Sequence, residues 1–257
     1  MKRHFGKWLT AAALAVGCTV MTANAFADTN GHWAESAINK WSGEYGIIQG
    51  YDDGTFRPDK SITRGAFAGI LDRFLHFQNA SPADTFSDTA GTYWEDAILK
   101  LHASGIYLGN QGAALPSSTI TRQQAVAMIG RAFRIAPETA APDYTDTDQI
   151  AEYAMAYVGE FEARGYLTDS AAGTFRPTDP ITRAELINIL SNMVDTLVKE
   201  TTTVTEDVSG SLLISAADGA TLKGIRIGGD LILAPGVTKD VTLVDCVIQG
   251  NIRNYGT

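Results

Sequence analysis

Three arginines that could bind an anion recur in one sequence context. Arg64, Arg122 and Arg183 each follow an Ile-Thr dipeptide. A glycine precedes these arginines by 18, 17 and 18 residues, at Gly46, Gly105 and Gly165 respectively. A guanidinium presents a planar fork of N–H donors that can pair bidentately with a carboxylate. The spacing therefore predicts three copies of one unit, each with an arginine suited to binding a carboxylate.

Each of these arginines is expected in the first turn of a helix, because the threonine before it is a helix-capping residue. Thr182 and Glu185 have the spacing of a capping box, as do Thr121 and Gln124, whereas Thr63 keeps only half of the pattern. The N–H groups exposed at a helix start favour anions, so a cation there opposes the helix dipole at a cost of a few tenths of a kcal/mol. Because this unfavourable placement of an arginine occurs in all three units, we expect each arginine to have a partner.

Two kinds of partner fit this pattern, and they can coexist. The first is an internal salt bridge to Asp28, Asp88 or Asp146, which open the three units in an aromatic-x-Asp motif. The second is a ligand carboxylate, held by the guanidinium and the helix N-terminus together. An internal carboxylate could also orient the arginine that binds the ligand.

Hydrophobic periodicity predicts that each unit is a helix, a loop and a second helix. The three glycines before the loops are expected to be left-handed helix caps, and the loops are rich in turn residues. Short linkers favour one compact domain. The predicted boundaries are 26–80, 81–140 and 141–198.

The hydrophobic pattern changes in residues 199–257, where short apolar runs replace the helical periodicity. Gly210, Gly229 and Gly250 bracket these runs at separations of 19 and 21 residues. Strands at such a period predict a partial right-handed parallel β-helix, with a β-meander as the alternative. Because stacked arrays usually need about three or more repeats, we expect that the natural chain continues or that this end packs against something.

Residues 1–25 read as a secretory signal peptide, with a basic start, an apolar stretch and small residues at the end. Cleavage is expected after Ala25, with Ala27 as the alternative. Removing Lys2, Arg3 and Lys7 changes the net charge from −9 to −12, which argues against nucleic acid as a partner. No later apolar run is long enough to span a bilayer, so no membrane insertion is expected after cleavage.

Neither catalysis, nor a metal site, nor a cofactor is predicted. The segment 199–257 contains acidic and basic residues but no histidine and no recognisable acid/base pair. Asp52-Asp53-Gly54 lacks the remaining ligand spacing of a calcium loop, and the histidines lack zinc spacing. A polysaccharide-active enzyme on a β-helix is the less favoured alternative.

These motifs resemble the S-layer homology family over residues 26–198. The family has an aromatic-x-Asp opening, a Trp in the first helix, a Gly-Thr-Phe-Arg-Pro turn and an Ile-Thr-Arg-Ala-Glu helix start. The first unit matches this pattern with Asp28, Trp33, the turn 54–58 and the segment 62–64. The third unit matches nearly completely from Tyr144 to Glu185.

The resemblance implies a helical, pseudo-threefold domain of a secreted protein at the bacterial cell surface. It implies grooves between units that bind a secondary cell wall polysaccharide, often one ending in a pyruvylated amino sugar. The residues it implies for ligand binding are Arg64, Arg122, Arg183, Asp28, Asp88, Asp146, Trp33, Trp94, Gly46, Gly105 and Gly165. Trp33 and Trp94 could equally be core residues. A self-assembling envelope protein that uses the β-segment is the alternative function.

The second unit departs most from the family pattern. It has Gly112 to Pro116 in place of Gly-Thr-Phe-Arg-Pro, and Gln123-Gln124 in place of Ala-Glu. We therefore expect the three grooves to bind unequally, with the groove that uses the second loop as the weakest candidate.

Overall fold

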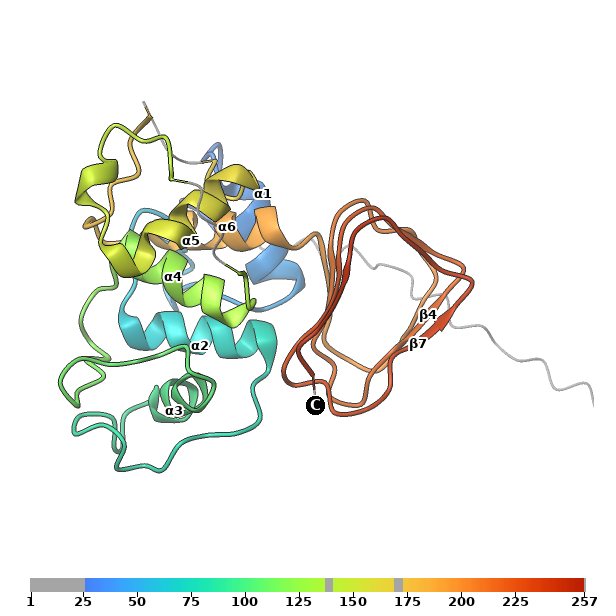
Figure 1. Ribbon diagram of the computed structural model, residues 1–257, viewed down its shortest axis with the longest axis horizontal. Helices are drawn as coiled ribbons and strands as arrows, with labels where there is room; N and C mark the ends of the chain where they lie inside the picture. Colours follow the sequence, from blue (N-terminus) through green and yellow to red (C-terminus); the bar gives the residue numbers. More distant parts are fainter. Residues whose placement is uncertain (1–25, 137–140, 169–172, 257) are drawn as a thin grey trace, which may run out of the picture.

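A helical part and a part built of short strands lie side by side in the computed structural model (Figure 1). The structure describes residues 26–136, 141–168 and 173–256. The predicted signal peptide, residues 1–25, lies outside these ranges. None of the helices within them is long and apolar enough to cross a membrane.

Among the described residues, six α-helices and two short helical turns make up the helical part. The arginines 64, 122 and 183 each begin a helix, as predicted. The elements are α1 (Glu35–Ile38), the π-helical turn η1 (Asn39–Glu44), α2 (Arg64–Leu75), α3 (Glu95–Ala103), α4 (Arg122–Ala132), the 3-10 turn η2 (Thr147–Gln149), α5 (Glu152–Ala163) and α6 (Arg183–Met193).

The predicted helix caps are confirmed. Thr121 and Thr182 form complete capping boxes with the residues three positions on. Thr63 accepts a hydrogen bond from the N–H of Ala66 and makes the half cap that its sequence allows. The predicted left-handed glycines have φ angles of 64°, 71° and 69°, at Gly46, Gly105 and Gly165.

The three segments before α2, α4 and α6 bond to one another in a closed ring. The N–H of Ile62 donates to the carbonyl of Ile181, that of Ile181 donates to Ile120, and that of Ile120 donates to Ile62, with N···O distances of 3.0, 3.0 and 3.2 Å. The starts of α2, α4 and α6 therefore meet at one centre. Outside the centre, α3 packs on α2, α5 on α4 and α1 on α6.

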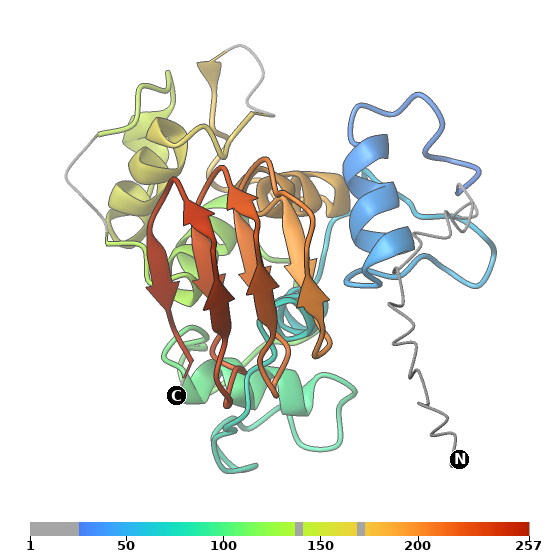
Figure 2. The ribbon, with the colours of Figure 1, turned by 90° about the vertical axis from the view of Figure 1, so that its right-hand side faces the viewer.

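Nine strands follow in the described residues up to 256, and every ladder among them is parallel. The chain visits three sheets in turn, with strand orders β1-β3-β6-β9, β2-β4-β7 and β5-β8 (Figure 2). This parallel register contradicts a meander, in which neighbouring strands would be antiparallel. The strands are β1 (Thr196–Val198), β2 (Thr203–Val204), β3 (Leu212–Ile214), β4 (Thr221–Lys223), β5 (Arg226–Ile227), β6 (Leu231–Leu233), β7 (Thr242–Val244), β8 (Val247–Ile248) and β9 (Ile252–Asn254).

The two parts touch through polar contacts between distant segments. The N–H of Gly236 donates to the carbonyl of Leu75 at 3.3 Å, and the hydroxyl of Tyr255 donates to the carbonyl of Phe133. Lys40 Nζ lies 3.7 Å from a carboxylate oxygen of Asp195. The start of the β-stranded part is thus tied to the helical part, and so is the residue that follows its last strand.

Candidate functional site

The three predicted aspartates hold loops in place through backbone N–H groups. Asp146 accepts hydrogen bonds from the N–H groups of Phe175 and Arg176 at 2.8 and 2.7 Å. Burial alone would raise the pKa of Asp146, but these two bonds outweigh it and hold the pKa below its ordinary value. The same pair of bonds joins Asp28 to Phe56 and Arg57, and Asp88 to Ala114 and Leu115.

Each predicted arginine contacts a residue that an aspartate already holds. Arg122 Nε donates to the carbonyl of Phe175 at 2.8 Å, while Asp146 accepts from the N–H of that residue. In the same way Arg64 Nε donates to Ala114 and Arg183 Nε to Phe56, at 2.9 and 2.8 Å. The arginine and the aspartate are thus joined through one loop residue, a partner that the sequence did not predict.

The two predicted tryptophans differ in their surroundings. Trp33 is 55% exposed. Trp94 instead lies flat against α2, where a Cβ atom on Gly65 or Gly69 would fall 2.4 or 2.5 Å from its ring. The position that matches Trp33 in the second unit is Tyr93, because each lies two residues after a left-handed glycine, and Tyr93 is 83% exposed. Trp94 is therefore not the counterpart of Trp33 and packs on α2, in line with the core alternative for this residue.

The predicted glycines shape the backbone and offer no surface to a ligand in the cavity described next. With φ angles between 64° and 71°, Gly46, Gly105 and Gly165 end the first helical segment of each unit. A left-handed backbone is costly for residues with a side chain, so the repeated glycine has a structural explanation.

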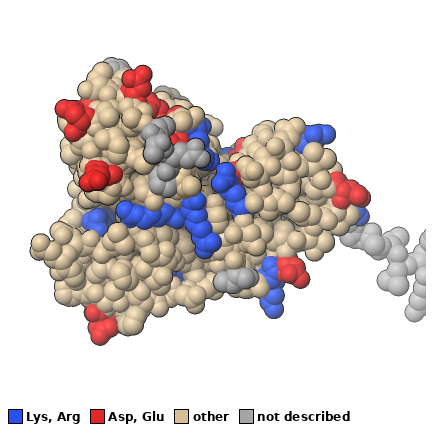
Figure 3. Space-filling model, viewed as in Figure 1, with Lys and Arg blue, Asp and Glu red and all other residues tan. Residues whose placement is uncertain are grey.

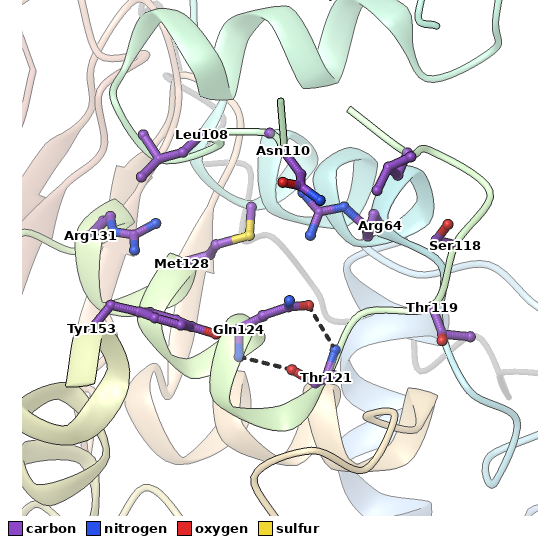
Figure 4. Close-up of a pocket in the computed structure, with 12 residues that line it drawn as sticks. Arg64, Leu108, Asn110, Ser118, Thr119, Thr121, Gln124, Met128, Arg131 and Tyr153 are labelled. Atoms are coloured by element: carbon purple, nitrogen blue, oxygen red, sulfur yellow. Dashed lines mark hydrogen bonds between the residues drawn. The ribbon is translucent and has the colours of Figure 1, made fainter. Parts of the chain in front are cut away.

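A cavity of about 530 Å³ opens beside Arg64 (Figure 4). Its walls come from the start of α2, the second loop, α4 and the start of α5. Met128 and Leu108 supply apolar surface, and Tyr153 presents an aromatic side chain. The lining residues are Arg64, Leu108, Gly109, Asn110, Leu115, Ser118, Thr119, Thr121, Gln124, Met128, Arg131 and Tyr153.

The cavity is positively charged in a protein whose net charge is −9. Arg64 and Arg131 both line it, and none of the described residues that line it is acidic. Basic side chains form a row across this face, over α4 (Figure 3). Two cations without a lining carboxylate favour an anionic ligand, and polar side chains beside them offer further hydrogen bonds.

Arg131 is a site residue that the sequence reasoning missed. Its Nη1 donates to the carbonyl of Ile106 at 3.0 Å, which holds the guanidinium at the cavity wall. Arg73 makes the matching contact in the first unit, from Nε to the carbonyl of Ile47 at 2.8 Å. The signal was an arginine nine residues after Arg64 and again nine after Arg122.

The other two predicted arginines are largely enclosed by protein. Arg122 is 1% exposed, and its Nη1 lies 3.2 Å from Glu185 Oε1. Arg183 is 8% exposed, and its Nη2 donates to the carbonyl of Gln49 at 2.6 Å. Arg64 is half-buried and borders the cavity. Within the part of the chain that the structure describes, Arg64 is therefore the predicted arginine that borders an open cavity, in the groove that uses the second loop, for which the sequence predicted the weakest site.

The chain is similar to parts of longer bacterial proteins. It is 35% identical to a cellulosome-anchoring protein of Acetivibrio thermocellus over 45% of this chain and 27% of that protein. It is 25% identical to S-layer protein EA1 of Bacillus anthracis, over 86% of this chain and 27% of that protein. An amylopullulanase of Thermoanaerobacterium thermosulfurigenes is 26% identical over 66% of this chain and 9% of its own length. The chain thus spans at most about a quarter of these relatives. Two of its segments, residues 25–68 and 143–187, match the S-layer homology domain.

Proposed function

We propose that this protein is a non-catalytic anchor that holds itself to the bacterial cell surface by binding a secondary cell wall polysaccharide without a covalent bond. The single observation that carries the proposal is the open, cationic cavity at Arg64. The matched S-layer homology segments and the cellulosome-anchoring and S-layer relatives support a cell-surface or cell-wall location.

The cavity suits an acidic sugar, such as one that carries a pyruvate ketal. The ligand carboxylate would pair with Arg64 and Arg131, both of which are already oriented by backbone carbonyls. The ring of Tyr153 and the side chain of Leu108 would contact an apolar sugar face. The activity of the amylopullulanase is not carried over, since the chain covers only 9% of that enzyme.

We also infer the architecture that serves this role. The ring of hydrogen bonds at Ile62, Ile120 and Ile181 supports a pseudo-threefold helical domain of three units within residues 26–198. The parallel ladders support coils of a β-helix in residues 199–257. The first 25 residues would direct export as a signal peptide.

The test is co-sedimentation with purified bacterial wall sacculi, before and after hydrofluoric acid removes the secondary polymers. We expect the protein to bind intact sacculi, to lose binding to stripped sacculi, and to bind at least about tenfold more weakly as Arg64→Ala. Arg226→Ala, at an exposed position of the β-stranded part, is the matched control and should bind normally. Equal sedimentation with stripped sacculi would overturn the proposal.

A second candidate function, self-assembly, is favoured by the exposed apolar residues of the last strands. Leu243, Val247 and Ile252 are 42%, 47% and 57% exposed, and β7, β8 and β9 each lie at the edge of their sheet. Unpaired strand edges template pairing with another chain. Sedimentation velocity over a concentration series would show association that Ile252→Lys abolishes; a monomer at every concentration would eliminate this candidate.

A further inference from the structure

We propose that Gln124 is the residue that makes the Arg64 groove available to an anionic ligand, because it caps its helix without bringing a negative charge into the groove. This inference rests on the proposed function. It assigns ligand binding to the groove of Arg64. It also explains why Arg122 and Arg183 make internal contacts that stabilise the fold.

The three grooves differ at one equivalent position, three residues after each capping threonine. Ala66, Gln124 and Glu185 occupy it in α2, α4 and α6. The three units follow one another in a closed ring, and each of these helices faces the arginine of the unit before it. Gln124 therefore lies in the groove of Arg64, and Glu185 lies in the groove of Arg122.

Glu185 shows what a carboxylate does at this position. Its Oε1 lies 3.2 Å from Arg122 Nη1 and accepts a hydrogen bond from Arg176 Nη2 at 2.6 Å. Its Oε2 accepts the N–H of Thr182 at 2.8 Å. Burial alone would raise the pKa of Glu185, but Arg122, the Thr182 N–H and Arg176 outweigh it and hold the pKa below its ordinary value. The internal carboxylate thus takes the place that a ligand carboxylate would need beside Arg122.

Gln124 keeps the cap and omits the charge. Its side-chain Oε1 accepts the backbone N–H of Thr121 at 3.1 Å, and its backbone N–H donates to the Thr121 hydroxyl at 3.4 Å (Figure 4). The amide lines the cavity with Arg64 and Arg131. A neutral side chain here leaves the positive potential of both guanidinium groups directed at a ligand.

In the third groove, an aromatic ring covers the arginine. Ala66 brings no carboxylate there, but the guanidinium of Arg183 lies 5.1 Å from the ring centre of Tyr51 and 4.3 Å from that of Phe56. The guanidinium of Arg64 also lies over one ring, 4.7 Å from the centre of Tyr107, so the additional ring in the third groove is that of Tyr51. Tyr51 lies five residues after the first-unit glycine, where the second unit has Asn110. The departures of the second unit from the repeat pattern therefore combine to open its groove: a small amide replaces a ring, and Gln replaces Glu.

The test compares three variants in the sacculus assay. Gln124→Glu keeps the cap and adds a charge, and we expect it to weaken binding at least about tenfold, because the carboxylate competes with the ligand for Arg64. Gln124→Met keeps only the half cap seen at Thr63 and stays neutral, so we expect it to bind more tightly than Gln124→Glu because it places no carboxylate beside Arg64. Gln249→Glu adds the same charge at an exposed site of the β-stranded part and should bind normally.

Thermal unfolding of each variant would separate loss of fold from loss of binding. If Gln124→Glu does not fold, Arg131→Gln lowers the charge of the same cavity from the other wall and should also weaken binding. If Arg64→Ala binds weakly while Gln124→Glu binds like the parent, this inference is overturned and the proposed function stands. If Gln124→Glu does not fold, parent-like binding by Arg131→Gln has the same meaning. Parent protein that does not distinguish intact from stripped sacculi would overturn both.

Discussion

At the scale of single residues, the recurring feature is a loop residue whose backbone N–H and C=O are both held by side chains. An aspartate accepts the N–H of a loop residue while an arginine from another unit donates to its carbonyl, as Asp146 and Arg122 do at Phe175. The residue after it adopts a left-handed backbone, with φ of 58° at Arg176. Backbone strain of this kind persists only where the surroundings hold it, so the aspartate and the arginine fix the loop together.

Removing the aspartate should destabilise the fold. In Asp146→Ala the N–H groups of Phe175 and Arg176 lose their acceptor, and we expect the free energy of unfolding to fall by about 1–3 kcal/mol. Urea denaturation measures the change. Asp148→Ala, two residues away and exposed, is the control, and equal stability of the two variants would refute the role given to Asp146.

Glu185 should make stability depend on acid pH. Its folded pKa lies below the ordinary value of 4.5, so the carboxylate stabilises the protein above that value and the contribution is lost as the pH falls through the folded pKa. Glu185→Gln should lower the free energy of unfolding at neutral pH and flatten its decline as the pH falls below the ordinary pKa of 4.5. Denaturation at a series of pH values checks both; an unchanged slope would contradict the prediction.

At the scale of elements, helix pairing depends on glycines that bring an indole close to a helix backbone. Gly65 and Gly69 lie one turn apart in α2, and both face the ring of Trp94 just before α3. Glycine costs about 1 kcal/mol relative to alanine within a helix. The close approach of Trp94 offsets this cost through buried aromatic surface.

Gly69→Ala should therefore destabilise the protein although alanine is the better helix former. Its Cβ would lie 2.5 Å from Trp94 Cζ3, and relieving such a contact costs about 1–3 kcal/mol. In a Trp94→Ala background the same change should instead be stabilising. A double-mutant cycle by thermal or urea unfolding measures this reversal of sign, and a Gly69→Ala effect of the same sign in both backgrounds would disprove the contact.

At the scale of the whole molecule, the β-stranded part is docked on the helical part by close backbone approach. Gly236 lies against the end of α2, where an added Cβ would fall within 2.8 Å of the carbonyl carbon and even closer to the carbonyl oxygen of His76. His76 in turn places its Nδ1 3.2 Å from the carbonyl oxygen of Ser215, and its own backbone is left-handed with φ of 55°. The junction is therefore sensitive to one methyl group.

Gly236→Ala should loosen this junction without unfolding either part. We expect faster amide hydrogen exchange at Gly236 and Tyr255, whose N–H groups lie in or near the contact, while exchange within α4 stays unchanged. Thr201→Ala, at an exposed position of the β-stranded part, should leave the exchange rates as they are. Parent-like protection of Gly236 in the variant would show that the contact tolerates a side chain.

The features that depend on local sequence could be predicted from it. A capping box spans four residues, and a left-handed glycine acts on its own backbone, so the starts of α4 and α6 and the ends of the first helical segments followed from residue types and spacing. The order of repeated motifs likewise indicated the matches at 25–68 and 143–187. The short apolar runs after residue 199 indicated strands, and strands are present there.

What only the tertiary structure decided was which arginine is accessible and which groups surround it. The neighbours of Arg64, Arg122 and Arg183 come from loops and helices about 50 to 130 residues away along the chain. Spacing within one unit carries no information about such neighbours, so a carboxylate beside Arg122 and a ring over Arg183 could not be foreseen. The incomplete motif of the second unit predicted a poor groove because the sequence shows only which motif residues are missing. The packing of the folded chain shows that their absence leaves a cavity.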